Sequence, residues 1–229
     1  MSHMTKDMPQ PLIERLAENA EQVAFGWRRE AWQAAMYDDD ATLALLDRLG
    51  ENVDRETTRT VVLEELSAGR VTPAFVAAMI WGHGMTGYGP ARVRWVLTGV
   101  RGRTSITAPI RSDVLEKLTD GAKVARESGP VEGFRYMNNS GKILHLGGSF
   151  FTKWLYFTTA VDGIADPNAA PILDAQVAGW LREHNVESLR IDKTPAYENY
   201  LRLLVDWGQR SGRAPAQVEA AIFHLATGR

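Results

Sequence analysis

A single lysine inside an aromatic segment is the residue of this chain best suited to covalent chemistry. Lys153 is the only charged side chain between Phe150 and Phe157, and most of its neighbours there are aromatic. Burial disfavours the charged form of an amine, and a neutral amine has a lone pair free for nucleophilic attack. The alternative is a lysine at the edge of the core, whose stem is buried and whose amine reaches water.

An aspartate stands further along the chain, at the start of a second helical pattern. Asp174 follows the apolar residues Pro171, Ile172 and Leu173 and precedes a pattern that runs to residue 183. A carboxylate at this position can accept hydrogen bonds from the first amides of the helix. Capping alone would explain the residue, but it would also fix the direction of the carboxylate for chemistry.

Two adjacent glycines precede the lysine. Gly147 and Gly148 lie between apolar residues and, because they lack Cβ, can take up dihedral angles that other residues avoid. We therefore expect a tight hairpin turn here, with Ser149 as the cap of the following helix. The unpaired amides of such a turn can bind a phosphate oxygen.

Helical periodicity accounts for most of the chain, so we expect an all-α, mostly helical fold. The expected helices span residues 17–36, 42–49, 57–66, 72–80, 90–97, 113–126, 131–136, 149–159, 175–183, 196–209 and 215–226. Residues 104–107 are the best candidate for a strand. Residues 81–89 form a glycine-rich loop that does not follow a strand, so it is not a nucleotide-binding motif. It is either a plain connection or a ligand wall made by Trp81, His83 and Tyr88.

The composition excludes several classes of protein. There is no cysteine, which excludes disulfides, thiolate catalysis and cysteine-ligated metals. The five histidines lie far apart, so we expect neither a metal nor another cofactor. No apolar run approaches the roughly 18–20 residues that span a bilayer, and no signal peptide begins the chain. Residues 1–4 read like a cloning remnant, and we expect a cytoplasmic protein without a membrane partner.

Charge is distributed unevenly along the chain. The net charge is −2, made up of −7 over residues 1–69, +5 over residues 70–135 and 0 over residues 136–229. A basic face for a nucleic acid could therefore come from the middle segment, through Arg92, Arg94, Arg101, Arg103 and Arg111. An ordinary solvated surface is the alternative.

The glycine turn, the lysine and the aspartate together resemble one enzyme family. The segments from Leu146 to Lys153 and from Pro171 to Asp174 are similar to those of the helix-hairpin-helix DNA glycosylases. More narrowly, residues 142–226 resemble the 8-oxoguanine DNA glycosylase branch in its compact prokaryotic and archaeal forms. The resemblance implies a two-lobed helical fold packed as one globular unit. Its N-terminal lobe would be residues 5–135, and its catalytic region residues 136–229.

The resemblance also implies a mechanism. Lys153 would attack C1′ of the damaged nucleotide, displace the base and form a Schiff base, and loss of a C2′ proton would then cut the strand by β-elimination. Asp174 would stabilise positive charge on the sugar or help to deprotonate the lysine. The groups expected to hold the DNA backbone are Lys142, Gly147, Gly148 and Ser149.

Base recognition would follow extrusion of the nucleotide from the duplex. The resemblance implies that Phe157, one turn after the lysine, and Phe223, in the last helix, stack on the base. Glu219, one turn before Phe223, stands where the family often has glutamine and could accept hydrogen bonds from a guanine edge. All three residues could instead belong to the core or to a solvated helix face.

The resemblance thus predicts a DNA glycosylase with AP lyase activity on 8-oxoguanine. It would be a monomer that needs no cofactor and binds double-stranded DNA with a damaged base in the nucleoid. A glycosylase for another modified base is one alternative, because substrate choice depends on the shape of the pocket. A non-catalytic helix-hairpin-helix module is the other, and it would bind DNA in a salt-dependent way without releasing a base.

Overall fold

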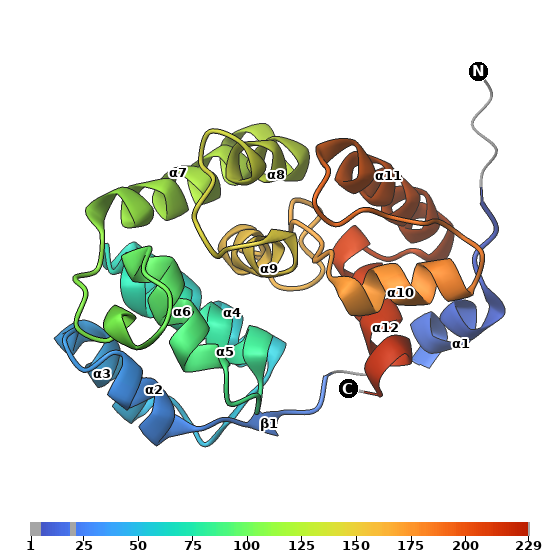
Figure 1. Cartoon of the computed structure of the whole chain (residues 1–229). Helices are drawn as coiled ribbons and strands as arrows, with labels where there is room; N and C mark the ends of the chain where they lie inside the picture. Colours follow the sequence, from blue (N-terminus) through green and yellow to red (C-terminus); the bar gives the residue numbers. More distant parts are fainter. Residues whose placement is uncertain (1–5, 19–21, 229) are drawn as a thin grey trace.

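The computed structural model describes residues 6–18 and 22–228, and the predicted cloning remnant at residues 1–4 lies outside them. Within these ranges the chain forms twelve α-helices and one two-stranded sheet (Figure 1). The helices are α1 Gln10–Glu18, α2 Arg29–Ala35, α3 Asp40–Arg48, α4 Arg55–Ser67, α5 Val71–His83, α6 Gly89–Thr98, α7 Ser112–Ser128, α8 Pro130–Asn138, α9 Gly148–Thr159, α10 Ala175–Glu183, α11 Thr194–Ser211 and α12 Pro215–Thr227. The strands are β1 Phe25–Gly26 and β2 Asn52–Val53, and η1 Arg103–Ser105 is a 3-10 helix. The predicted all-α fold class is confirmed.

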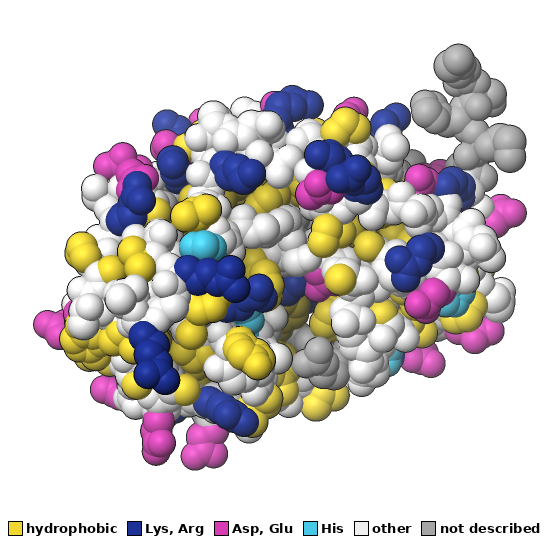
Figure 2. All heavy atoms as spheres, viewed as in Figure 1, with side chains coloured by type: hydrophobic (Ala, Val, Ile, Leu, Met, Phe, Trp, Pro, Cys, Tyr) yellow, Lys and Arg dark blue, Asp and Glu magenta, His cyan; other side chains and the backbone are white. Residues whose placement is uncertain are grey.

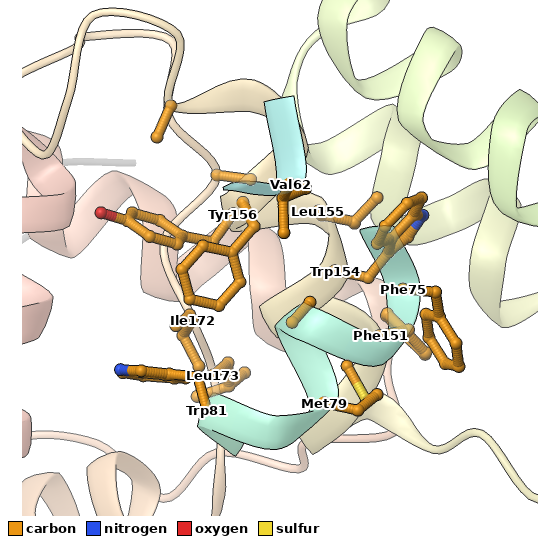
Figure 3. Close-up of a cluster of buried hydrophobic side chains, with 14 of the residues drawn as sticks. Val62, Phe75, Met79, Trp81, Phe151, Trp154, Leu155, Tyr156, Ile172 and Leu173 are labelled. Carbon is orange, nitrogen blue, oxygen red and sulfur yellow. The ribbon is translucent and has the colours of Figure 1, made fainter. Parts of the chain in front are cut away.

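Helix α9 lies in the middle of the molecule (Figure 1). Every residue from Phe151 to Thr159 is buried, and the helix packs against α4, α5, α7 and α8. A helix that is apolar on all sides must be enclosed by protein, because any exposed face would leave aromatic groups in water. Figure 3 shows this core, in which Phe75 of α5 meets the edge of Trp154 of α9 with ring centres 5.7 Å apart.

The helices on either side of α9 form two groups. Helices α2 to α6 lie on one side and α10 to α12 on the other (Figure 1). Helix α1 joins the second group, because it packs against α12 and the Leu16 carbonyl accepts a hydrogen bond from Arg213 at 2.9 Å. The predicted boundary between the two lobes, at residue 135, falls inside helix α8. The division of the chain into lobes stays a prediction.

Three expected elements are wrong. Residues 17–36 do not form one helix, because α1 ends at Glu18 and β1 pairs antiparallel with β2 before α2 begins. Trp27 and Trp32 in this region are both buried, so the apolar pattern reflected burial of separate elements. Residues 104–107 are not a strand, since 103–105 form a 3-10 turn. Helix α5 runs on to His83, which shortens the predicted glycine-rich loop.

Candidate active site

The amine of Lys153 and the carboxylate of Asp174 form an ion pair in the interior. Their Nζ and Oδ2 atoms are 2.7 Å apart, and the two side chains are only 6% and 10% exposed. The amine also donates to the carbonyl oxygen of Ser149, one helical turn earlier, at 3.0 Å. The carboxylate of Asp174 can accept a proton from this amine, and an amine attacks through its free lone pair. Attack by Lys153 therefore requires the neutral amine.

Asp174 combines this contact with the role of helix cap. Its Oδ1 accepts hydrogen bonds from the backbone amides of Gln176 at 3.0 Å and Val177 at 3.2 Å, which leaves Oδ2 facing the amine. Burial pushes the pKa of Asp174 upward, but the charge and hydrogen bond of Lys153 and the two amides outweigh it. The pKa of Asp174 therefore lies below its usual value. The carboxylate is ionised at neutral pH, in a direction fixed by the cap.

The segment before Asp174 is held from two helices. Tyr197 and Tyr200 of α11 donate their hydroxyl hydrogens to the carbonyls of Pro171 and Ile172, each at 2.9 Å. On the other side, the Thr152 hydroxyl of α9 lies 3.3 Å from both the amide nitrogen and the carbonyl oxygen of Leu173. All of these groups are buried, so the hydrogen bonds resist competition from water. They set the distance between α9 and the start of α10, and hence the ion pair.

The stem of Lys153 runs between α5 and an aromatic ring. A Cβ placed on Gly82 would lie 2.9 Å from Cδ of the lysine, so a side chain at that position would displace the stem. The amine lies 5.5 Å from the centre of the Phe150 ring, and that ring stacks on His83 at 4.3 Å. Burial, together with the positive charges of Arg92 and Lys153, lowers the pKa of His83 to about 4. His83 is therefore uncharged at neutral pH.

The turn before α9 differs from the prediction. The residue with left-handed backbone is His145, at φ 69°, whereas Gly147 has an ordinary φ of −92°. Gly148 is required for another reason, because a Cβ there would lie 2.1 Å from the carbonyl oxygen of Ile191. Gly147 is the N-cap residue of α9, and Ser149 lies inside the helix, so Ser149 is not the cap. Lys142 is exposed beside this turn.

Three aromatic side chains meet in the core next to the ion pair. Trp81 lies edge-on to Phe157, with ring centres 5.2 Å apart, and its ring centre is 6.2 Å from that of Phe223. The structure thus brings the two predicted stacking residues together through Trp81, which we expected in a loop and which lies in α5. Phe157 and Phe223 are nearly inaccessible here, so their role in stacking on a base stays a prediction.

Glu219 has a partner that the sequence did not reveal. Its two carboxylate oxygens accept hydrogen bonds from Arg55 of α4, at 2.5 and 3.0 Å, and the glutamate is fully buried. The guanidinium carbon of Arg55 lies 5.0 Å from the centre of the Trp81 ring and 4.8 Å from that of Tyr156. Burial raises the pKa of Glu219, although Arg55 opposes this effect. Contact of Glu219 with a guanine edge would require it to release Arg55.

The surface near these residues is hollowed. Figure 2 shows a depression between the side with α5 and α6 and the side with α10 and α12, with Lys and Arg side chains along its α6 edge. A separate cavity of about 560 Å³ is lined by Arg55, Tyr156 and Phe223, together with residues of α1, α12 and the segment 162–165. Neither Lys153 nor Asp174 lines this cavity.

The part of the chain that the structure describes contains no group of three or more His, Asp or Glu side chains that could hold a metal ion. Among the same residues, no helix is both apolar and long enough to cross a lipid bilayer.

Comparison with known proteins gives one match. The family model described as "Putative 8-oxoguanine DNA glycosylase OGG-like protein" matches residues 18–223. The chain belongs to this family. Neither the curated proteins nor the solved structures include a significant match. The match includes residues of both helix groups, the ion pair and the aromatic group, so it extends well before residue 142, where the resemblance seen in the sequence began.

Membership assigns a general role. This is a protein of the DNA glycosylase class, with DNA as its partner, and its helical fold is consistent with that of the helix-hairpin-helix glycosylases. Gly82, Phe150 and Arg55 belong to the site geometry but were not predicted from the sequence. Gly82 gave a signal as one of the glycines near residue 84, and Phe150 as one end of the aromatic segment, whereas Arg55 gave none.

Proposed function

We propose that this protein excises 8-oxoguanine from double-stranded DNA and then cleaves the strand by β-elimination. The observation that carries this proposal is the buried contact between Lys153 and Asp174 at 2.7 Å, in a chain of the DNA glycosylase class. An amine next to an oriented carboxylate has the two groups that a Schiff-base route requires, a nucleophile and a nearby proton acceptor.

The first step is proton transfer from Lys153. Oδ2 of Asp174 is the nearest acceptor, since Oδ1 is held by two amides. The neutral amine then attacks C1′, the C1′–N9 bond breaks, and its electron pair leaves with the base, which takes up a proton. One proton then leaves the attached nitrogen for solvent, and the nitrogen electron pair forms the C1′=N bond as the C1′–O4′ bond breaks. O4′ takes up a proton and becomes a hydroxyl on C4′, so the product is a protonated imine.

Strand cleavage follows from the imine. Loss of a proton from C2′ sends an electron pair toward the iminium nitrogen, and the 3′-phosphate departs with the C3′–O bond electrons. Hydrolysis of the resulting conjugated imine returns the free amine. Asp174 gives the proton it accepted to the departing base, and its carboxylate can then stabilise the positive charge that remains on the sugar and the nitrogen.

We infer that the base stacks against the aromatic group of Trp81, Phe157 and Phe223. These rings now pack on one another within 5.2–6.2 Å, so entry of a base requires that they separate. Stacking with a purine would replace the ring contacts that are lost. The hairpin groups and Lys142 would hold the phosphates beside the extruded nucleotide, and a protein acting on chromosomal DNA would work in the cytoplasm, at the nucleoid.

The test is an oligonucleotide duplex with one 8-oxoguanine, analysed on a denaturing gel with and without borohydride. Wild-type protein should nick the strand and become covalently trapped. Lys153→Gln should lose both products, while Lys123→Gln, which changes an exposed lysine of α7, should retain them. Trapping that survives Lys153→Gln would refute the nucleophile. A panel of other lesions in the same assay would reveal a different base as the substrate.

A further inference from the structure

A band of side chains, exposed except for one half-buried tryptophan, crosses helix α6 and reaches the turn before α9. It consists of Arg92 and Trp95 of α6, Arg101 after that helix, and His145 of the turn, and we call it the α6 strip. The guanidinium of Arg101 lies 5.5 Å from the centre of the Trp95 ring, and the ring of His145 meets Trp95 at 6.2 Å. The strip therefore joins the α2–α6 side of the molecule to the turn that precedes Lys153.

The strip is continuous with the candidate active site. Arg92 is close enough to His83 that its charge helps to lower the pKa of that histidine. His83 stacks on Phe150, whose ring lies beside the amine of Lys153. A partner that contacts the α6 strip would thus extend to the edge of the hollow seen in Figure 2.

The cations of the strip lack acidic partners. Residues 66–112 contain no aspartate or glutamate. Among the described residues, neither Arg92 nor Arg101 forms an ion pair, whereas Arg94 and Arg111 of the same segment pair with Asp38 and Asp113. Arg94 is buried, so the predicted basic face loses that member. On the α10–α11 side, by contrast, the exposed Arg190 and Lys193 both pair with Asp192.

Two features restrain the strip before any partner arrives. Stacking on Trp95 limits the orientations of the Arg101 guanidinium, which favours contact with a planar or phosphate group. His145 has a left-handed backbone, a conformation that is costly for a residue with a side chain and that is found mostly where surrounding structure or function requires it. Cations without ion pairs, one of them oriented by the half-buried ring of Trp95, fit a polyanion with an extended backbone.

We propose that the α6 strip is a second DNA contact surface, which binds phosphates of the duplex beside the lesion. It extends the DNA contact from the turn before α9 to the group of helices α2 to α6. The proposal rests on DNA as the partner of this family, and it does not depend on which base is removed or on the lyase step. Its physical basis is counterion release, because each phosphate neutralised by an arginine frees condensed cations from the duplex.

The test is the salt dependence of binding to a fluorescent duplex that carries a stable abasic-site analogue, measured by anisotropy. The logarithm of the binding constant falls linearly with the logarithm of the salt concentration, and each lost phosphate contact makes that slope less steep by about 0.9. Between about 50 and 200 mM salt, the decrease in affinity should be about 3.5-fold smaller for Arg92→Gln or Arg101→Gln than for wild type, and about 12-fold smaller for the double variant. The matched control is Arg202→Gln, an exposed arginine of α11, which should keep the wild-type slope.

A further variant tests the stacking. Trp95→Leu should weaken DNA binding in the wild-type background. It should have little additional effect when Arg101 is already glutamine, because both changes remove the same stacked pair of Arg101 and Trp95. Arg92→Gln and Arg101→Gln with the same slope as Arg202→Gln would overturn the proposal. If no lesion is excised but the slopes change as expected, the proposed chemistry fails and the α6 strip stands.

Discussion

Substituting Asp174 by asparagine separates the charge of this residue from its role as a helix cap. Asparagine caps a helix about as well as aspartate, so the hydrogen bonds to Gln176 and Val177 should persist. The variant leaves the amine of Lys153, whose side chain is 6% exposed, without a counter-charge. Removing one partner of a buried ion pair typically costs about 3–5 kcal/mol. We expect the free energy of unfolding to fall by that amount.

The matched control is Asp39→Asn. Asp39 caps α3 through the amide of Thr42 but forms no ion pair among the described residues, so its change should cost well under about 1 kcal/mol. The double variant Lys153→Met/Asp174→Asn removes both charges and should recover much of the stability that Asp174→Asn loses. Urea unfolding of wild type, Lys153→Met, Asp174→Asn and the double variant gives the coupling energy, provided that the m-values agree.

The same variant should lower the rate of base excision. Proton transfer by a positioned side chain contributes roughly 10²–10⁴-fold, so single-turnover excision by Asp174→Asn should fall within that range. If Asp174→Asn matches Asp39→Asn in both stability and rate, the buried charge has neither role and the reasoning is wrong.

The difference between wild type and Asp174→Asn should also depend on pH. The pKa of Asp174 is lowered in the folded protein, so its stabilising effect is present above the unfolded-state pKa of about 4 and is lost as the pH falls through the folded-state pKa. Urea unfolding from neutral pH to about pH 3 should show the gap in stability narrowing in acid. A gap that widens would contradict the assignment.

Two more predictions use pairs of variants. Gly148→Ala should destabilise the fold by about 1–3 kcal/mol, because its Cβ would meet the Ile191 carbonyl at 2.1 Å, whereas Gly147→Ala, with open space around it, should be close to neutral in thermal unfolding. Glu219→Gln leaves Arg55 buried without its counter-charge and should cost about 3–5 kcal/mol, while Arg55→Met/Glu219→Met should regain most of it. If Glu219 contacts the base instead, Glu219→Gln should change the preference among lesions more than the double variant does, as an excision panel would show.

The sequence by itself determined the helical architecture and the two candidate residues of the chemistry. Periodic apolar residues specify a helix locally, because the period of 3.6 residues is a property of the backbone. This explains why the helices near residues 175–183 and 215–226 were predicted within about a residue or two. Lys153 stood out since no other charge occurs in its segment, and Asp174 did so as a residue suited to begin a helix.

Only the tertiary structure decided which groups meet. The contact of Lys153 with Asp174 depends on where Thr152, Tyr197 and Tyr200 hold an intervening segment, and no local pattern encodes that. The partner of Glu219 is Arg55, 164 residues away. Such pairings follow from the packing of whole helices, so a residue type at one position says little about its partner at another.

The glycines near α9 show the same limit. Two adjacent glycines suggested a turn with unusual dihedral angles, yet the residue with positive φ is His145, and Gly148 is needed for the close approach of Ile191. The absence of a side chain can serve backbone freedom or backbone contact, and sequence cannot distinguish them. Local periodicity thus determined the helices of this protein, and contacts between distant segments decided the ion pair, the aromatic group and the surface offered to DNA.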